Sequence, residues 1–238
     1  MLEIETDGPL AVLTMNRPEK RNAMCDALLD RIAAFFDAPP EGVKVAVLAG
    51  AGGHFCSGLD LAEQELRDAE GTMRHSRGWH RVMDRVQFGG LPVVACLTGA
   101  VIGGGLELAA AAHVRVAEPS ARFQLPEGRR GIFVGGGASV RIGRLIGPDR
   151  MTEMMLTGRT YGAEEGVRLG FAHEIVAEGQ GLARARALAL QIAGNAPLSL
   201  KGMKRILNLI EASASLSGEA RREAEAIFAA ALQSEDAK

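Results

Sequence analysis

The sequence has few of the residues that mark several specialised protein classes. Its three cysteines, Cys25, Cys56 and Cys96, are odd in number and widely spaced, which argues against a disulfide framework and indicates a reducing compartment. Aromatic residues make up only 4% of the chain, so there is little material for stacking nucleic-acid bases. The net charge of -2 gives no electrostatic attraction for nucleic acids or membranes. We therefore expect neither as a partner.

The common motifs for metals, nucleotides and serine nucleophiles are absent as well. There is no CxxC or HExxH sequence, and the five histidines do not cluster, so we expect no metal site. Neither a P-loop nor a GxSxG sequence occurs. The N-terminus has no signal-peptide pattern, and no apolar run reaches the about 18 residues that a transmembrane helix requires. These absences predict a cytoplasmic protein without a cofactor of its own.

The remaining composition is typical of a soluble globular protein with a large core, since 47% of the residues are apolar and 24% are charged. Hydropathy patterns divide the chain into two regions. Residues 1–180 alternate short strands with helices, and the strands come in pairs before a helix. Residues 181–238 have helical periodicity throughout. The sequence thus predicts an α/β fold of repeated ββα units followed by a C-terminal helical region.

Turn and cap residues set several of the expected boundaries. Asp7-Gly8 predicts a hairpin between two short strands. Asn22 is the expected N-cap of a helix that ends at residue 37, before two prolines. The polar interval 63–78 has weak helical periodicity, and we expect it to be mobile. Further strands are expected at 43–49, 91–97, 113–118 and 171–176, and further helices at 79–88, 182–193, 197–210 and 217–232.

Two glycine-rich turns are the first candidates for a functional site. One covers residues 53–58 and the other is Gly103–Gly105, and each follows an apolar strand. Bare backbone at a turn lets a ligand approach N–H groups that have no partner within a helix. If the two turns lie side by side, each can donate one N–H to the same oxygen, as in an oxyanion hole. The alternative is that the glycines serve only tight packing.

Two carboxylates accompany these turns. Glu107 follows the triple glycine within one helical turn, and Glu127 follows Pro126. A pair of carboxylates beside an oxyanion hole can position and activate water by general acid–base catalysis. Taken singly, each glutamate is more typical of an exposed surface position.

Six segments that span nearly the whole chain resemble the crotonase family, the enoyl-CoA hydratases and isomerases. The resemblance implies a crotonase-like spiral, with 1–180 as the core that holds an acyl-CoA site and 181–238 as an oligomerisation region. It also implies self-association into a homotrimer or homohexamer. The matching segments are NRPEKRNAM at 16–24, GGHFCSGLDL at 52–61, TGAVIGGGLEL at 98–108, FQLPEGRRGIFVGGGAS at 123–139, LTGRTYGAEEGVRLGFAHEIV at 156–176 and NAPLSLKGMKRILN at 195–208.

By this resemblance, the N–H groups of Ser57 and Gly104 form the oxyanion hole that holds the thioester carbonyl. Glu107 and Glu127 fall on the positions that hydratases use as acid and base when water adds to a 2-enoyl-CoA. Coenzyme A is part of the substrate, and no other cofactor is implied. The resemblance places the coenzyme A moiety against Arg21, Asn22, Ala23, Phe55, Ser57, Gly58, Asp60 and Leu61.

The acyl end of the expected site is less well defined. Trp79, His80 and Met83 fall where the family lines its acyl pocket, although plain helix packing explains these residues at least as well. The pair Arg129-Arg130 is more basic than expected there, which suggests a polar or carboxylated acyl group. Val134 stands where the family usually has a proline, and the chain ends earlier than the family normally does.

Family isomerases generally keep only the position of Glu127, so the presence of both glutamates favours a hydratase. Isomerase, hydrolase or lyase chemistry on the same oxyanion hole stays open. A non-catalytic acyl-CoA-binding role also stays open, because a fold does not fix its chemistry. The acyl chain and the pathway cannot be read from the sequence.

Overall fold

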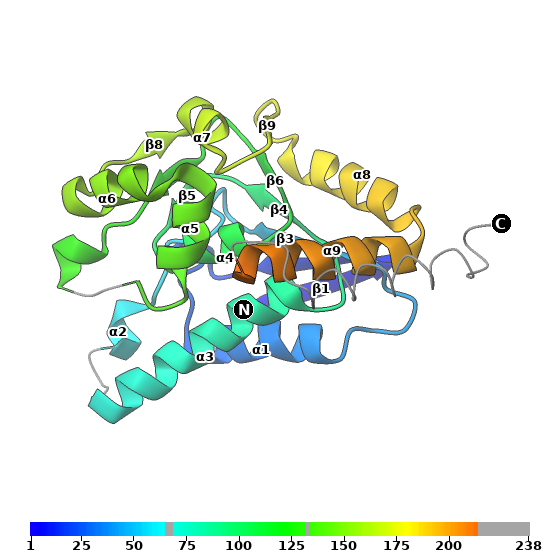
Figure 1. Cartoon of the computed structure of the whole chain (residues 1–238), viewed down its shortest axis with the longest axis horizontal. Coiled ribbons are helices and arrows are strands. Elements are labelled where there is room, and N and C mark those ends of the chain that lie inside the picture. Colours follow the sequence, from blue (N-terminus) through cyan, green and yellow to red (C-terminus); the bar gives the residue numbers. More distant parts are fainter. Residues whose placement is uncertain (65–68, 132–133, 214–238) are drawn as a thin grey trace.

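Two β-sheets organise the computed structural model, which describes residues 1–64, 69–131 and 134–213 (Figure 1). Six strands form the larger sheet in the order β1-β2-β3-β4-β6-β9, and the smaller sheet has the order β5-β7-β8. In the larger sheet, β1 and β2 pair antiparallel and the other neighbours pair parallel. The strands are β1 (Leu2–Asp7), β2 (Leu10–Met15), β3 (Val45–Gly50), β4 (Val93–Leu97), β5 (Ala100–Ile102), β6 (Val114–Ala117), β7 (Arg122–Gln124), β8 (Tyr161–Gly162) and β9 (Glu174–Ile175).

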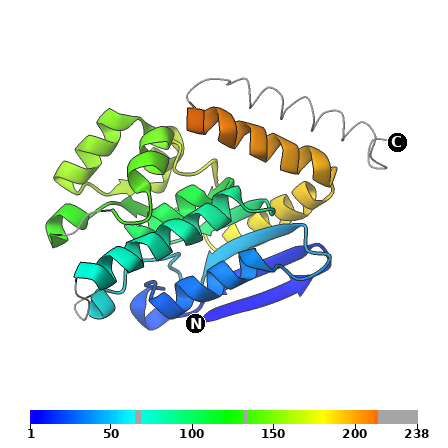
Figure 2. The ribbon, with the colours of Figure 1, turned by 60° about the horizontal axis from the view of Figure 1, so that its bottom comes forward.

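Helices cover both faces of the larger sheet and surround the smaller one (Figures 1 and 2). They are α1 (Asp26–Asp37), α2 (Leu61–Gln64), α3 (Ala69–Phe88), α4 (Gly104–Ala111), α5 (Ala138–Ile146), α6 (Pro148–Thr157), α7 (Ala163–Leu169), α8 (Gly181–Ala193) and α9 (Pro197–Ser213), with short 3-10 helices η1 (Pro18–Lys20) and η2 (Glu127–Arg130).

Two strands of the smaller sheet continue from strands of the larger sheet. β4 leads through Thr98 and Gly99 into β5, and β6 leads into β7 in the same way. Because a sharp turn separates the members of each pair, consecutive strands enter different sheets. A helix then closes each unit, α4 after β5 and η2 with α5 after β7. The predicted ββα repeat is confirmed, and its turns gather at one edge where the two sheets meet.

The larger sheet is buried on both faces because its central strands alternate their side chains. In β3, Ala46 and Leu48 pack into the layer formed with α1, α3 and α4, whereas Val45 and Val47 face α8. The α8 side chains that meet this second face are small, as Ala185 shows, so the helix axis lies close to the sheet. The sheet is therefore a rigid platform for the turns at its edge.

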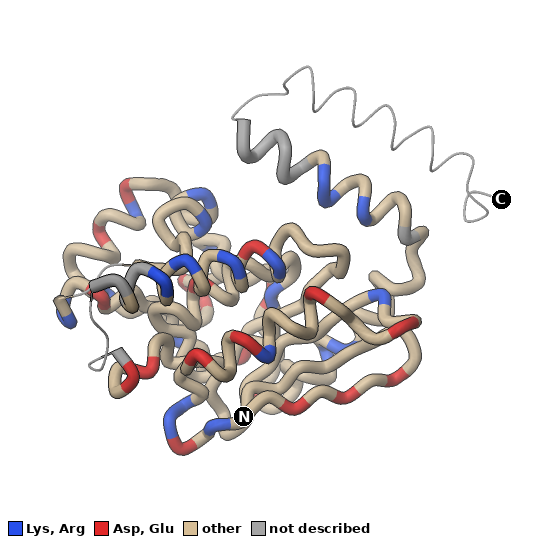
Figure 3. The backbone as a smooth tube through the Cα atoms, turned by 90° about the horizontal axis from the view of Figure 1, so that it is seen from below, with Lys and Arg blue, Asp and Glu red and all other residues tan. Residues whose placement is uncertain are grey.

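The N-terminal hairpin forms one edge of the larger sheet (Figure 2). Gly8 turns the chain with φ of 54°, which confirms the hairpin predicted at Asp7-Gly8. The outer strand β1 exposes Glu3, Glu5 and Asp7 along this edge (Figure 3). Charges on an edge strand discourage pairing with another sheet.

Within the polar interval 63–78, the residues that the structure describes are helical, which the weak periodicity does not predict. α3 runs from Ala69 to Phe88 as one helix, and α1 lies beside it (Figure 1). Polar contacts hold its first half, since Ser76 Oγ donates to Gly135 O at 3.1 Å. Hydropathy records burial and not such contacts, so the expected start of the helix at residue 79 is wrong. The second half buries Trp79, Val82, Met83 and Val86.

Two of the three helices expected after residue 181 are present as α8 and α9, and the third, at 217–232, lies outside the described residues. α8 belongs to the core of the larger sheet. α9 is attached through Lys204, whose Nζ donates to Gly89 O at 2.7 Å and to Leu91 O at 2.8 Å. In the part of the chain that the structure describes, no helix is long and apolar enough to cross a membrane.

Candidate active site

The turn between β5 and α4 delivers an unpaired amide to the edge where the sheets meet. Gly103 has φ of 54° and ψ of −124°, a conformation that glycine adopts without steric cost. α4 then begins at Gly104, and its first amides point out of the helix. Among the described residues, the Gly104 N–H donates to no acceptor. This amide is free to bind a ligand oxygen.

A second unpaired amide belongs to Leu59. Met24 and Leu59 form a single parallel bridge, in which Met24 N–H donates to Gly58 O at 2.7 Å and Asp60 N–H donates to Met24 O at 3.0 Å. Since Leu59's neighbours bond to one side, its own N–H points to the other side. No acceptor for this N–H occurs in the described ranges.

The two unpaired amides come from adjacent backbone segments. Cys56 bridges Val101 of β5, which lays the 53–58 loop along the strand that leads to α4. A Cβ atom placed on Gly58 would lie 3.1 Å from Gly104 N and 2.8 Å from Ile102 O. The amide of Leu59 thus follows a residue in direct contact with the Gly104 turn. Two unpaired N–H groups on neighbouring segments are the kind of donors that an oxyanion hole requires.

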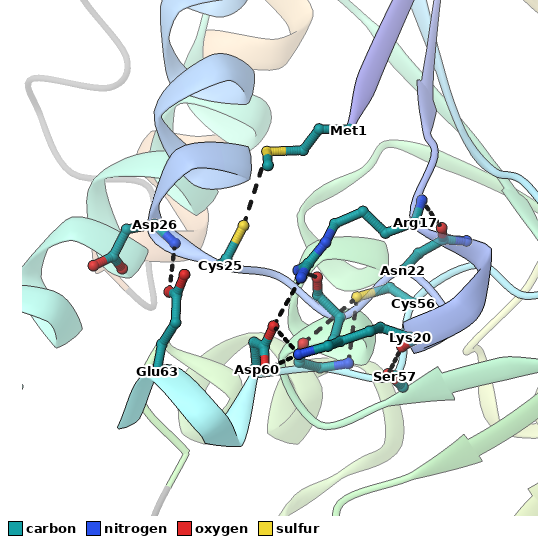
Figure 4. Close-up of polar contacts among 12 residues, drawn as sticks. Met1, Arg17, Lys20, Asn22, Cys25, Asp26, Cys56, Ser57, Asp60 and Glu63 are labelled. Atoms are coloured by element: carbon teal, nitrogen blue, oxygen red, sulfur yellow. Dashed lines mark hydrogen bonds and ion pairs between the residues drawn. The ribbon is translucent and has the colours of Figure 1, made fainter. Parts of the chain in front are cut away.

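The Ser57 amide, predicted to be the second donor, is already bonded in this structure. Ser57 N–H donates to Arg21 O at 2.9 Å, and Ser57 Oγ donates to Lys20 O at 3.0 Å. Ser57 therefore ties its loop to the turn after η1 (Figure 4). The sequence identifies the loop, but it does not indicate which of the loop's amides has no hydrogen-bond partner. The Leu59 amide is therefore not predicted.

The Glu107 side chain is almost fully buried and is held by main-chain amides. Gly136 N–H donates to both carboxylate oxygens, at 2.9 and 3.1 Å, and Ala138 N–H donates to Oε1 at 3.0 Å. A Cβ on Gly136 would lie 2.7 Å from Oε2, so only glycine leaves room for this contact. Burial raises the pKa of Glu107, while the two amides and the charges of Arg141 and His80 oppose that rise.

Glu127 lies against the glycine turn before α4, but its carboxyl group accepts fewer hydrogen bonds than that of Glu107. A Cβ on Gly103 would lie 2.8 Å from Glu127 Oε1, so this carboxyl group packs against the glycine turn. Its other oxygen, Oε2, is buried and has no hydrogen-bond partner among the described residues. Burial and the nearby charge of Glu107 raise the pKa of Glu127 to about 7. At neutral pH a large part of Glu127 is thus protonated and able to donate a proton.

Burial of Glu127 predicts a measurable pH dependence of stability. Its folded pKa of about 7 lies above the ordinary 4.5, so its stabilising contribution is complete below pH 4.5 and is lost as the pH rises through 7. Glu127→Gln cannot ionise and escapes this loss. Between pH 4.5 and 8, we expect the free energy of unfolding of wild type to fall by about 3 kcal/mol more than that of the variant. Urea unfolding at both pH values measures this, and an unchanged difference would contradict it.

The segments predicted to hold coenzyme A lie side by side, but several of their residues act as internal supports. Asn22 is fully buried with φ of 59°, and its Nδ2 donates to Ala51 O at 2.9 Å and to His54 O at 2.6 Å. It is therefore not the N-cap of α1, which begins at Asp26. Phe55 is also fully buried. These two residues shape the loops and offer no surface to a ligand.

Asp60 is the electrostatic centre of the same region (Figure 4). It is 6% exposed, and its carboxylate accepts hydrogen bonds from Arg17 at 2.9 Å and from Lys20 at 3.1 Å. These hydrogen bonds and charges hold the pKa of Asp60 below its usual value despite desolvation by burial. The ion pairs fix the turn that carries Arg21 and Ala23. Arg21, with φ of 50°, is exposed, whereas Ala23 is buried.

Of the residues predicted to line an acyl pocket, Trp79 lies against the site. A Cβ on Gly104 would lie 2.1 Å from Trp79 Cζ3, so the indole packs directly on the glycine turn. Met83 is fully buried in the core, and His80 is exposed. Arg129 is bound elsewhere, because its Nη2 donates to Thr157 O, at the end of α6, at 2.6 Å.

Arg141 is a buried charge beside the site that the sequence analysis missed. It is 8% exposed, and its Nη1 donates to Gly136 O at 2.7 Å. A signal was available, because Arg141 interrupts the apolar stripe formed by Ala138, Ile142 and Leu145 at helical spacing. Val134, where the family usually has a proline, is buried in the core at the start of the same loop.

Comparisons with known proteins agree on one family. A family model described as enoyl-CoA hydratase/isomerase matches residues 5–238. Mevalonyl-coenzyme A hydratase SIDH of Beauveria bassiana is 40% identical over 201 residues, which cover 79% of this chain and 71% of that protein. Short-chain-enoyl-CoA hydratase of Clostridium acetobutylicum is 32% identical over 210 residues, which cover 86% and 80%. A solved structure from Rhodopseudomonas palustris, provisionally assigned as an enoyl-CoA hydratase, is 45% identical with a TM-score of 0.92 and covers 99% of this chain and 91% of that chain.

Proposed function

The chain belongs to the enoyl-CoA hydratase/isomerase family, and from that premise we propose that it is a hydratase that adds water across the 2,3 double bond of a 2-enoyl-CoA. The main supporting observation is that two unpaired amides adjoin two buried carboxylates. The amides belong to Leu59 and Gly104, and the carboxylates to Glu107 and Glu127. Relatives named as hydratases support the same reaction.

The proposed oxyanion hole consists of the N–H groups of Leu59 and Gly104, with Leu59 in place of Ser57. The thioester carbonyl oxygen accepts both hydrogen bonds, which draws electron density from the conjugated double bond toward that oxygen. Carbon 3 becomes electrophilic, and the enolate that follows attack is stabilised by the same two donors. Both donors are main-chain groups, one held by the bridge to Met24 and the other by the start of α4, so they need no reorganisation during the reaction.

The proposed roles of the two glutamates follow from their surroundings. Glu107, held by two amides, acts as the carboxylate that accepts a proton from water as the hydroxide oxygen bonds to carbon 3. Glu127, with a pKa raised to about 7, donates its proton to carbon 2 as the enolate collapses. Proton exchange through solvent then restores both groups. The two carboxylates and two amides account for hydration, and we propose no cofactor beyond the coenzyme A of the substrate.

We further propose that coenzyme A lies beside Arg21 and along the segment 57–61. Arg21 is exposed on the outer turn, and its guanidinium suits a phosphate group of the ligand. Assembly into a homotrimer or homohexamer is the expected state, supported by exposed apolar side chains on α8 and α9 such as Leu190 and Met203. A cytoplasmic location remains an expectation, supported by three cysteines that form no disulfide among the described residues.

Incubation of the purified protein with crotonyl-CoA tests the hydratase proposal. We expect loss of the conjugated enoyl absorbance and a product that is heavier by one water. Because one relative is named a mevalonyl-CoA hydratase, mevalonyl-CoA is assayed in the dehydration direction beside it. A 3-enoyl-CoA serves as the competing substrate. Conversion of the 3-enoyl-CoA to its 2-enoyl isomer, with no water added to any substrate, would support an isomerase and contradict the proposal.

A further inference from the structure

The guanidinium of Arg141 links three separate parts of the fold. From α5, Nη1 donates to Gly136 O at 2.7 Å. Nε donates to Gln87 Oε1 and Nη2 donates to Asp84 Oδ1, both at 2.5 Å and both on α3. The three bonds use three different nitrogens of one planar group, an arrangement that lysine cannot reproduce. Arg141 therefore fixes the position of Gly136 relative to α3.

The backbone that Arg141 holds is the same backbone that holds Glu107. The Gly136 carbonyl lies between the two amides that bind the Glu107 carboxylate, those of Gly136 and Ala138. A Cβ on Gly137 would lie 2.4 Å from Arg141 Nη1, so the guanidinium fills the space beneath this turn. Movement of the carbonyl would rotate the adjoining peptide groups and misdirect both amides.

The anchor on α3 is itself well supported. The backbone carbonyl of Gln87 bonds to His113 Nε2 at 2.9 Å, and His113 Nδ1 accepts the Val93 N–H at 3.0 Å. Gly89 O, just past the end of α3, accepts the Lys204 bond described above. The end of α3 is thus connected to the sheet and to α9. Arg141 transmits this fixed position to the loop around Glu107.

We propose that Arg141 is a positioning residue for Glu107, which keeps the 136–138 turn in the conformation that binds the Glu107 carboxylate. The inference rests on the proposed function, because it gives Glu107 its catalytic task. Arg141 touches neither the amides of the oxyanion hole nor Glu127. Its effect therefore reaches the reaction through Glu107.

The charge of Arg141 acts in the same direction as its hydrogen bonds. Glu107 on α4 faces Arg141 from α5, His80 from α3 and Glu127 from η2. Burial raises the pKa of Glu107, and the positive charges of Arg141 and His80 lower it. Removal of Arg141 raises the pKa of Glu107. As the pH is lowered, a reaction that needs ionised Glu107 then begins to slow at a higher pH in the variant than in wild type.

The test compares Arg141→Gln and Arg141→Lys with the matched control Arg115→Gln. Arg115 is another buried arginine, and it donates to the main-chain carbonyls of Ala112, Phe171 and Gly170. None of these bonds reaches the 136–138 turn that binds Glu107. We expect Arg141→Gln to lower kcat by about 100-fold, as for a misplaced catalytic group, with KM changed less than about threefold. The acid limb of its kcat profile should move to higher pH. Arg141→Lys should recover part of kcat and should restore the acid limb, because it keeps the charge.

Hydrogen exchange of the peptide that contains 134–138 gives a readout that does not depend on turnover. We expect faster exchange at the Gly136 and Ala138 amides in Arg141→Gln than in wild type or Arg115→Gln. Asp84→Asn is a second variant for the case that Arg141→Gln does not fold. It leaves the arginine in place and removes its anionic partner, so it should show the same faster exchange more weakly.

Two results would overturn the inference. One is an equal loss of kcat in the Arg141 and Arg115 variants with the acid limb unmoved, which indicates general destabilisation. The other is unchanged exchange at 134–138 in the Arg141 and Asp84 variants. If wild type hydrates none of the substrates, the proposed function fails, and the exchange result still decides whether Arg141 holds the turn.

Discussion

Glu127→Gln is expected to lower kcat for crotonyl-CoA hydration by about 10²- to 10⁴-fold, the usual contribution of a positioned general acid. The substitution is nearly isosteric, and Glu127 Oε2 has no protein partner among the described residues that the new amide would disturb. The loss therefore reports the missing proton and not a collapsed site. Steady-state kinetics over the pH range 5 to 9 measure it, and KM should change little.

Glu118→Gln is the matched control for Glu127→Gln. Glu118 is another buried carboxylate, 5% exposed, but it accepts a hydrogen bond from Gly181 N–H at 2.7 Å on the far side of the sheet. We expect this variant to be less stable than wild type and to keep its kcat. A Glu127→Gln variant that retains wild-type kcat while folding normally would remove Glu127 from the mechanism.

Gly58→Ala is expected to lower kcat by about 10²- to 10³-fold, the usual cost of losing one oxyanion donor. The new methyl group would lie 2.8 Å from Ile102 O and 3.1 Å from Gly104 N, so it forces apart the two segments that carry the donors. Both contacts are with main-chain atoms of a paired strand and a helix start, which cannot move aside cheaply. Steady-state kinetics with crotonyl-CoA measure the loss.

Gly42→Ala separates this effect from backbone strain. Gly42 has φ of 84° and Gly58 has φ of 93°, so alanine is disfavoured at both positions by about 1 kcal/mol. A Cβ on Gly42 meets nothing within 4 Å. The two variants should therefore share a modest loss of thermal stability, and only Gly58→Ala should lose kcat. Equal kcat in both variants would show that the contact with Gly104 is unimportant for catalysis.

Side-chain chemistry was the part of the site that could be predicted from the sequence. Glu107 and Glu127 each follow a marked turn, and the ββα repeat brings those turns to one edge. The Gly104 amide was also predictable, because the first N–H groups of any helix lack partners. Leu59 was not, since its freedom depends on a bridge to Met24, far earlier in the chain. Sequence patterns identify loops but not the pairing of each amide.

The sequence mispredicts Asn22, the first half of α3 and Arg141 for one shared reason. Hydropathy counts polar residues as exposed. Asn22 looked like a helix cap, but its buried amide bonds two loop carbonyls and stabilises a left-handed turn. The first half of α3 looked mobile because its contacts are polar. The sequence does not predict Arg141 as part of the site for the same reason. In each case, a polar side chain satisfies main-chain groups from a distant segment, and no periodicity records that.

The bridge between Met24 and Leu59 has a consequence for how this site can be recognised. The proposed second donor is the main-chain N–H of Leu59, a group that every residue except proline supplies, so alanine scanning would pass over Leu59. Changes in loop length are a different matter. Deleting one residue between Cys56 and Leu59 would turn the Leu59 amide to the opposite side of its bridge with Met24. The direction of this amide is therefore set by the number of residues between Cys56 and Leu59, and not by the identity of Leu59 itself.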